Sequence, residues 1–456
     1  MRRIFTARAA FTALFFLSAT YADAKEQILP KLPTLPRKVF PGGPGQLVDE
    51  GGTRAPEKIP ENFREPAADK PWLIRMMIHD IKNGMFIGLP IIDTDPNRGA
   101  TYGVMPIWVW QGGTDKRIKH IWAPSLSYNK TFQWIATHRH YYYRTKESSY
   151  FTRVSASPEE NPDVVAEMED LNFHDKGFAV TAKFEYDTDG SNRFFGLGPD
   201  SRQGEETNFT KKTLGYFLRL GVPVFQDSGW KVNVAHKLAA TRIAAGLINA
   251  IPDIGARFPE QTPSHWHQDS AIQIFLDYDT RDNATTTRTG SYFKFLIENA
   301  QRGMGSEYTY SRYGFDLRHF YQPSNHPKIA TASRFRIEQL IGDVPFHILP
   351  SLGGKTTHRA YGDGRYVDKG MLTATIEERF TVFEVETAGV MTELQLAPFI
   401  GIGSVFNVPG KVHRKHMRPV VGGAVRAVAR PQVVGSIDVG VGQEGPAVFM
   451  DINYSF

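Results

Sequence analysis

Two pairs of histidines are the residues whose types and spacing could most directly do chemistry. The first pair is His138 and His140, and the second is His265 and His267. Residues two positions apart share one face of a strand, so each pair could offer two imidazoles to a metal. The sequence places no acidic third ligand beside either pair. Tyr141–Tyr143 adjoin the first pair, which favours an aromatic band at a membrane interface instead. We therefore expect no metal site and no cofactor.

The rest of the sequence gives no support to enzyme chemistry. The chain has 456 residues and no cysteine, which excludes thiol catalysis, zinc–cysteine sites and disulfides. A G-x-S-x-G nucleophile turn, a phosphate-binding loop and a dinucleotide fingerprint are all missing. The net charge of +5 is too small an excess to indicate nucleic acid. We expect a protein that is not an enzyme and binds no nucleic acid.

The N-terminal part of the sequence reads as an export signal followed by a tether. Residues 1–24 combine three arginines, an apolar stretch and the cleavage pattern Ala22-Asp23-Ala24, as in a secretory signal peptide cleaved near Ala24. Residues 25–84 are rich in proline, which predicts an extended periplasmic tether. Within it, 68–81 could form a short amphipathic helix.

From Gly99 onward, apolar and polar residues alternate in segments of about ten residues. In one segment Arg334, Arg336 and Glu338 share a face, and the apolar side chains between them take the other. Charges confined to one face suit a water-filled lumen, and apolar residues on the other suit lipid. The pattern predicts an all-β fold, a transmembrane β-barrel, over residues 85–456.

The last strand carries an additional signal. Ile452, Tyr454 and Phe456 alternate with polar residues, and the chain stops on Phe456. Such an end resembles the C-terminal recognition signal of bacterial outer-membrane barrels. It implies the barrel assembly machinery as a partner during insertion, and the bacterial outer membrane as the location.

Counting segments back from this end gives sixteen antiparallel strands, an even number as closed bacterial barrels have. The segments are 99–110, 118–128, 131–143, 146–156, 176–187, 207–222, 229–246, 266–278, 290–300, 306–322, 329–341, 371–382, 388–406, 417–429, 432–442 and 446–456. With a periplasmic C-terminus, the long connections 188–206, 247–265 and 342–370 fall outside the cell. The connection 157–175 would be periplasmic, with its acidic stretch as a short helix.

Several segments together resemble the bacterial surface-antigen domain of the BamA/TamA superfamily. They are Arg193–Ser201, Asp277–Asp282, Leu352–Gly354, His358–Tyr361, Glu377–Phe380 and Phe399–Gly403, in the order that the family has. The resemblance implies a sixteen-stranded outer-membrane barrel with a luminal loop plug. Members usually carry periplasmic POTRA repeats before the barrel. Residues 25–84 show no such repeat, so the chain resembles the barrel-only branch.

The resemblance also implies a luminal lock. The segment from His358 to Tyr361 matches the tip that folds from the sixth extracellular loop into the lumen, which makes Arg359 the buried cation and Tyr361 its neighbour. A buried arginine needs a carboxylate, and Glu377 is the matching acid on the twelfth strand. The family's second acid aligns with Gly401, so we expect a single ion pair, Arg359–Glu377. The alternative is that Arg359 is a solvated loop residue.

Two further motifs have structural rather than chemical roles. The residues Asp279, Arg281 and Asp282 are expected at a periplasmic turn, where aspartates satisfy backbone N–H groups. The loop containing Phe195, Gly196, Gly198 and Asp200 is expected to need unusual backbone angles and to serve packing.

Two classes of function remain open. The first is outer-membrane biogenesis or transport of a lipid or polypeptide cargo, which the resemblance implies. The second is a passive pore or structural barrel. In both, outer-membrane lipids surround the protein, and a homo-oligomer is possible.

Overall fold

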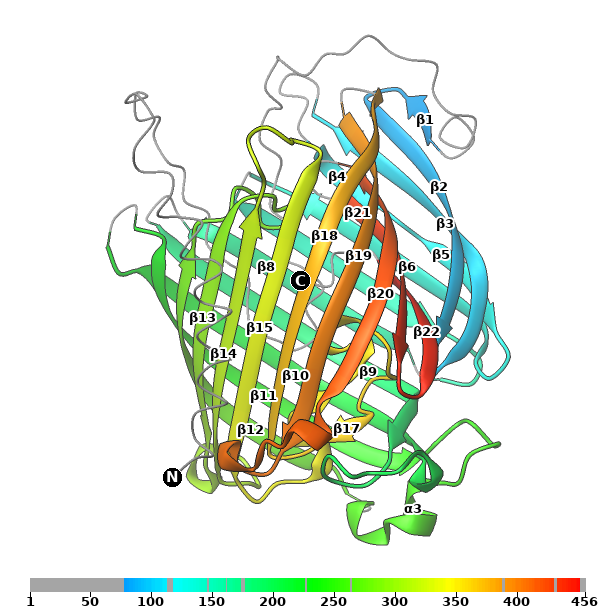
Figure 1. The fold of residues 1–456 in the computed structure, drawn as a ribbon, viewed down its shortest axis with the longest axis vertical. Coiled ribbons are helices and arrows are strands. Elements are labelled where there is room, and N and C mark those ends of the chain that lie inside the picture. Colours follow the sequence, from blue (N-terminus) through cyan, green and yellow to red (C-terminus); the bar gives the residue numbers. More distant parts are fainter. Residues whose placement is uncertain are drawn as a thin grey trace. The chain divides into compact units, whose positions relative to one another are not determined.

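The computed structural model describes residues 78–456 except 113–117, 146, 161, 174–176, 226–227, 263–264, 388–389, 430–432 and 452–456. The described part is built almost entirely of antiparallel strands (Figure 1). Its α-helices, α3 (Ile254–Arg257) and α4 (Gly354–Thr357), have four residues each. Neither has the length and apolarity to cross a membrane.

One closed antiparallel sheet forms the barrel, and its wall has 18 strands when β4 and β5 are counted as one interrupted strand. The strands are β2 (Gly84–Asp95), β3 (Gly99–Gln111), β4 (Ile118–Trp122), β5 (Ser125–Asn129), β6 (Gln133–Tyr143), β7 (Ser148–Ala156), β8 (Asp163–Phe173), β9 (Phe178–Phe194), β10 (Thr207–Pro223), β11 (Trp230–Ala245), β12 (His267–Asp279), β13 (Gly290–Ala300), β14 (Tyr310–Tyr321), β15 (Ile329–Gly342), β18 (Gly370–Thr387), β19 (Val390–Phe406), β20 (Arg418–Ala429), β21 (Val433–Gly442) and β22 (Gly445–Asp451). Each pairs with its neighbour along the chain, and β22 meets β2.

Side chains alternate between a polar interior and an apolar exterior, as in a barrel that faces lipid. On β18 the odd positions Thr373, Glu377 and Arg379 are buried in the barrel, and Ile376 between them is exposed. On β10 the exposed positions are leucines, Leu214, Leu218 and Leu220, as expected for a surface in contact with lipid chains. The alternation predicted from the sequence is therefore present.

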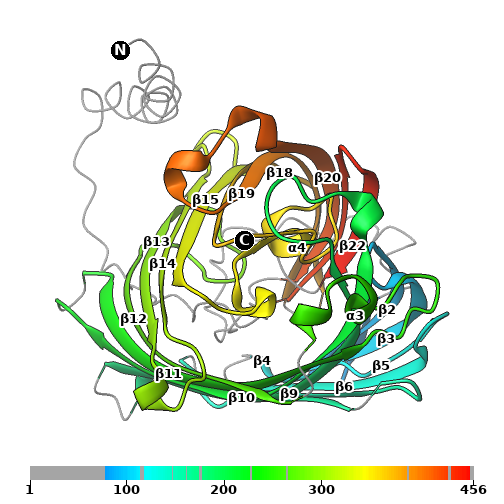
Figure 2. The same ribbon diagram turned by 90° about the horizontal axis from the view of Figure 1, so that it is seen from below.

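The connection between β15 and β18, residues 343–369, contains α4 and a small hairpin of β16 (Ser351–Leu352) and β17 (Tyr366–Val367). Seen along the barrel, α4 lies inside the ring of strands (Figure 2). We call the barrel end from which this connection starts the loop end. The opposite end, with the connections 280–289 and 322–328, is the turn end.

The expected count of sixteen strands is wrong, because two strands were missed. The first, β2, lies in and after the expected tether, where Pro90 and residues apolar on both faces hide the alternation. The second is β8, whose acidic residues were expected to form a helix. Instead they line the interior, and Glu169 of β8 accepts a hydrogen bond from Arg219 at 2.8 Å.

The added strand β8 also reverses the expected side of the first connections. Glu160, in the connection between β7 and β8, lies at the loop end, because it contacts Arg98 of the β2–β3 turn at 3.1 Å and the backbone N–H of Gly190 at 2.8 Å. The expected helix 68–81 lies mostly outside the described residues. Its last residues form a strand, β1 (Ile78–Ile81), which pairs with the start of β2.

Candidate functional site

The segment from His358 to Tyr361 is a tight turn buried against the inner wall of the barrel. The backbone N–H of Gly354 donates to the carbonyl of Tyr361 at 2.8 Å, which closes the turn. The rings of His358 and Tyr361 stack with centroids 5.3 Å apart. The Tyr361 hydroxyl accepts from the backbone N–H of Gln443 at 3.0 Å, and only 1% of the Tyr361 surface is exposed. We call residues 358–361 the tip.

Arg359 extends from the tip into a group of charged residues on the barrel wall. Its Nη1 lies 2.8 Å from Oε2 of Glu377 on β18 and 2.6 Å from Oδ1 of Asp438 on β21. The guanidinium also lies over the ring of Phe399 on β19, 3.6 Å from its centroid. The sequence-predicted residues Arg359, Tyr361 and Glu377 are thus brought together inside the barrel, and Arg359 is not a solvated loop residue.

Two more arginines contact the same carboxylates. Arg426 of β20 donates to both oxygens of Glu377, at 2.6 and 2.8 Å, and to Asp438 at 3.2 Å. Arg379 donates from Nε to Glu377 at 2.8 Å. Buried charges are tolerated only when they are paired and hydrogen-bonded, and here three guanidinium groups share two carboxylates. We call Arg359, Glu377, Arg379, Arg426 and Asp438 the arginine cluster.

The expectation of a single ion pair is wrong, because Asp438 supplies a second acid. Gly401 faces the interior, but it pairs with Thr375, which is two residues before Glu377 on β18. The β19 residue opposite Glu377 is Phe399. The missing carboxylate comes instead from β21, two strands away. Asp438 is the charged residue on the inward face of β21, where it lies between Ser436 and Gly440. A single charge on an otherwise uncharged inward face is the sequence signal that could have identified it.

The loop that follows β9 holds the base of the 343–369 connection. The backbone N–H of Gly198 donates to the carbonyl of Val367 at 2.8 Å, and the guanidinium of Arg365 lies 4.3 Å from the centroid of Phe195. Gly196 and Gly198 have φ of 87° and 93°, which side chains with a Cβ rarely adopt. Asp200, which is largely exposed, lies 3.1 Å from His416. The geometry is that of a packing loop.

The β12–β13 connection, residues 280–289, reaches into the barrel at the turn end. Arg281 makes two hydrogen bonds to Asp279, at 3.0 and 2.9 Å. Asp282 accepts from the backbone N–H of Asn283, Arg288 and Thr289. Across the interior, Arg288 donates to both oxygens of Glu393 on β19 at 2.9 Å. Arg379 of the arginine cluster donates to the carbonyl of Thr287 at 3.2 Å. This connection and the tip are therefore joined through Arg379 and Glu377.

The seam between β2 and β22 differs from the other strand junctions. In the described residues, β22 pairs with β2 only at Thr94↔Val448. Since β3 covers one edge of β2 from Gly84 to Asp95, β1 must occupy the other, where it pairs with Gly84–Ile87. The stretch of β2 between these two partners includes Pro90, which has no N–H to give to a sheet.

The wall beside the seam is apolar on both faces. Facing inward at the turn end are Met85 and Ile87 of β2, Met105, Ile107 and Val109 of β3, and Ile121 of β4, which form one buried cluster. Facing outward are aromatic rings, and Trp108 stacks on Trp122 with centroids 4.7 Å apart. His138 and His140 belong to this outer face, where His138 accepts from the indole N–H of Trp122 at 3.0 Å. We call the inward cluster the apolar strip.

The residues of the expected C-terminal signal, Ile452, Tyr454 and Phe456, lie outside the described residues. The segment just before them is in place, because β22 pairs with β21 from Gly445↔Gly442 to Asp451↔Ser436. Val448 faces outward, and Phe449 is buried in the interior.

Comparisons with known proteins place this geometry in context. A family model described as the Omp85 superfamily domain matches residues 148–441, more than half of the chain. No curated protein matches the chain in sequence. Among solved structures, BamA from Haemophilus ducreyi lacking POTRA domains 1–3 has a TM-score of 0.49 at 13% identity, covering 76% of this chain and 73% of that one. CdiB from Escherichia coli has a TM-score of 0.47 at 9% identity, covering 76% and 65%.

Proposed function

The chain belongs to the Omp85 superfamily, and from that membership we propose that it acts in outer-membrane biogenesis or in transport of a lipid or polypeptide across the outer membrane. In this proposal the seam between β2 and β22 is the working part of the barrel. The 343–369 connection is the plug, and the arginine cluster is the lock that holds it. The signal peptide is removed near Ala24, and the barrel assembly machinery inserts the mature chain.

The seam is the observation that carries the proposal. Barrels are stable in lipid because each strand satisfies the backbone groups of the next. Among the described residues this continuity rests on Thr94↔Val448, so the described part of the seam has fewer hydrogen bonds to break than the other strand junctions. A cargo that carries apolar groups and leaves the lumen through the seam would meet the apolar strip beside it.

A second candidate, the passive pore, is favoured by the opposite wall. The interior of β11–β15 is lined by charged residues such as Lys237, Glu298 and Arg336, which would suit an aqueous channel. The tip and the 280–289 connection lie across that interior, however. In the transport proposal, the tip and the 280–289 connection keep the pore closed. The two candidate functions therefore differ in whether molecules pass through the seam or through the lumen.

Cross-linking the seam tests this difference. The chain has no native cysteine, so a Thr94→Cys/Val448→Cys variant can form only the disulfide that closes β2 onto β22. The control is Val425→Cys/Ile437→Cys, which joins two outward residues that face each other on β20 and β21. Both variants are expressed in a strain that lacks the chromosomal copy, with and without a reductant.

We expect the oxidised seam variant to reproduce the deletion phenotype, a reductant to restore function, and the control to behave as wild type. Surface lipids, secreted proteins and outer-membrane protein levels are measured in parallel, and the class that changes identifies the cargo. Wild-type levels of all three with the seam fully cross-linked would contradict lateral transport and leave the pore as the better assignment.

A further inference from the structure

A group of two histidines and a glutamate lies at the loop end, away from the arginine cluster. His265 precedes β12, His267 is its first residue, and Glu307 lies in the connection between β13 and β14. The three come from two separate connections, yet their ligand atoms all lie within 4.8 Å of one another. Glu307 does not stand near this histidine pair in the sequence at a spacing that would suggest a third ligand. The folded hairpin β13–β14 brings Glu307 to it.

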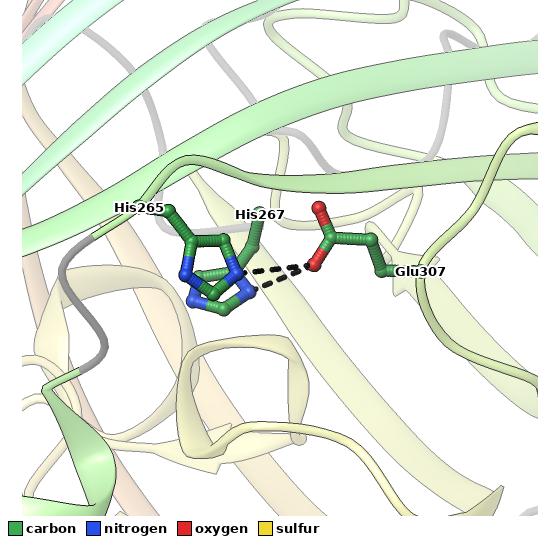
Figure 3. A group of neighbouring side chains, drawn as sticks. All are labelled: His265, His267 and Glu307. Carbon is green, nitrogen blue, oxygen red and sulfur yellow. Dashed lines mark hydrogen bonds and ion pairs between the residues drawn. The ribbon is translucent and has the colours of Figure 1, made fainter.

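The three side chains converge on one oxygen, Oε2 of Glu307 (Figure 3). His267 Nδ1 lies 3.0 Å from it, and His265 Nε2 lies 3.7 Å from it. The two imidazole rings lie next to each other, with centroids 4.2 Å apart. His267 is buried, whereas His265 is exposed, so one ligand is fixed by the barrel and another is open to solvent.

These spacings suit a tetrahedral metal. Zinc bonds of about 2.0–2.1 Å place neighbouring ligand atoms about 3.3 Å apart, between the two distances found here. Nitrogen and carboxylate oxygen are the ligands that zinc takes in open three-residue sites, where water completes the shell. The Glu307 carboxylate is held in place by the backbone N–H of Gln268, which donates to Oε1 at 3.0 Å, so Oε2 is the oxygen that faces the imidazoles.

The hydrogen bonds of His267 are unevenly distributed over its two ring nitrogens. The hydroxyl of Tyr308 lies 2.5 Å from the same Nδ1 atom of His267 that faces Glu307. Meanwhile Nε2 of His267 is buried and has no hydrogen-bond partner in the described residues. Two groups thus compete for one ring nitrogen while the other has no partner, so protein groups alone do not satisfy the hydrogen-bonding capacity of this imidazole. A metal at Nδ1 would use the crowded lone pair directly.

We propose that His265, His267 and Glu307 bind one divalent transition-metal ion, for which zinc is the best fit. The bound ion joins the start of β12 to the β13–β14 connection at the rim of the barrel. The ring of His347, in the connection that carries the tip, lies 6.3 Å from that of His267, so the ion would also stiffen the rim on which this connection rests. The inference does not depend on the proposed transport function.

Metal titration of the full mature chain tests the proposal. The protein is purified in detergent without a polyhistidine tag and titrated with Co²⁺, whose visible absorption reports a tetrahedral site, and then with Zn²⁺ as competitor. We expect one equivalent to bind. His267→Ala and Glu307→Gln should each weaken binding about 100-fold, since each removes one of three ligands. The control His138→Ala/His140→Ala should bind as wild type, because that pair packs against aromatic rings and its hydrogen-bond partners in the described residues are His120 and Trp122.

Two further readouts keep the test independent of folding. Heat-modifiable gel mobility establishes that each variant is a folded barrel before it is titrated. Zn²⁺ should raise the unfolding temperature of wild type and of the control, but not of the His267 and Glu307 variants, because a ligand stabilises only the state that binds it. Absence of saturable binding, or equal binding by wild type and the folded His267→Ala variant, would overturn the proposal.

Discussion

A Cβ atom placed on Gly440 would lie 1.6 Å from the carbonyl oxygen of Arg359. Gly440 is on the inner face of β21, and the tip packs directly onto its backbone. The next inward residue, Gly442, would place a Cβ 2.8 Å from the ring of Tyr361. The tip is therefore held by contact with bare backbone as well as by charge, and no side chain larger than hydrogen fits beneath it.

Gly440→Ala is expected to displace the tip while leaving the barrel closed. Overpacking of this kind typically costs about 1–3 kcal/mol, and here the tip can move away whereas β21 cannot. Protease should cut the 343–369 connection faster, and conductance in planar bilayers should rise when Arg288→Ala is added to release the 280–289 connection as well. The control is Gly423→Ala on the adjacent strand β20, where a new Cβ meets nothing within 4 Å. Wild-type protease resistance in Gly440→Ala would show that the tip does not depend on its contact with the backbone of β21.

Glu377→Gln should be more damaging than Arg359→Ala. Glu377 accepts from Arg359, Arg379 and Arg426, so neutralising it leaves three guanidinium groups against Asp438 alone. Leaving buried charge uncompensated costs about 3–5 kcal/mol. Removal of Arg359 leaves two arginines and two acids, a balanced set. An isolated Arg359–Glu377 pair, as expected from the sequence, would instead give equal effects. Urea unfolding of refolded barrels measures the difference, and equal midpoints for the two variants would contradict the role of the cluster.

Asp438→Asn should show that the second acid acts on the same arginine. Arg359 Nη1 lies 2.6 Å from Asp438, so a double-mutant cycle of Asp438→Asn with Arg359→Ala should give a coupling energy of about 0.5–3 kcal/mol. The matched comparison is Asp316→Asn, whose ion-pair partners are Arg318 and Arg334. Its effect should add to that of Arg359→Ala. Additive effects for Asp438 too would mean that this contact contributes nothing to stability.

The sequence predicted the barrel well where one face was polar and the other apolar. Strands such as β15 and β18, with charged residues at alternate positions, were identified close to their observed bounds. It failed at β2, where Met85 and Phe86 are both apolar although they face opposite sides, so no alternation could appear. It failed at β8 because the run of acidic residues suggested a solvated helix. Their luminal partner, Arg219, is remote in sequence.

The candidate site was predictable in part for the same physical reason. Arg359 and Glu377 stand in motifs that can be read locally. Asp438, Arg426 and Gly440 take their roles from neighbours 49 to 81 residues away in the chain, and their own local sequence is an ordinary strand. The acid for the histidine pair at the loop end likewise comes from another hairpin. Residues that come together only when the barrel closes are far apart in the sequence. The local spacing of residue types therefore cannot indicate that they are in contact.

Arg288→Ala and Arg359→Ala together should open the lumen far more than either alone. The tip packs on the inner wall at β18 and β21, held by Glu377 and Asp438. The 280–289 connection crosses the interior at the turn end, held by the bond of Arg288 to Glu393. In the proposed closed barrel both segments narrow the lumen in series, so the tighter one limits the current and releasing one leaves the other in control. Each single variant should conduct little more than wild type, and the double variant should exceed the sum of both increases.

Single-channel recordings in planar bilayers measure this directly. The control is Arg257→Ala, which removes a solvent-exposed pair with Glu205 at the loop end and should change conductance in neither the wild-type nor the Arg359→Ala background. If Arg288→Ala alone conducted as well as the double variant, the tip would not be a constriction. If Arg359→Ala alone did so, the 280–289 connection would not be one. Because Arg379 joins both segments through Glu377 and Thr287, Arg379→Ala should loosen both at once. It should therefore resemble the double variant more closely than either single one.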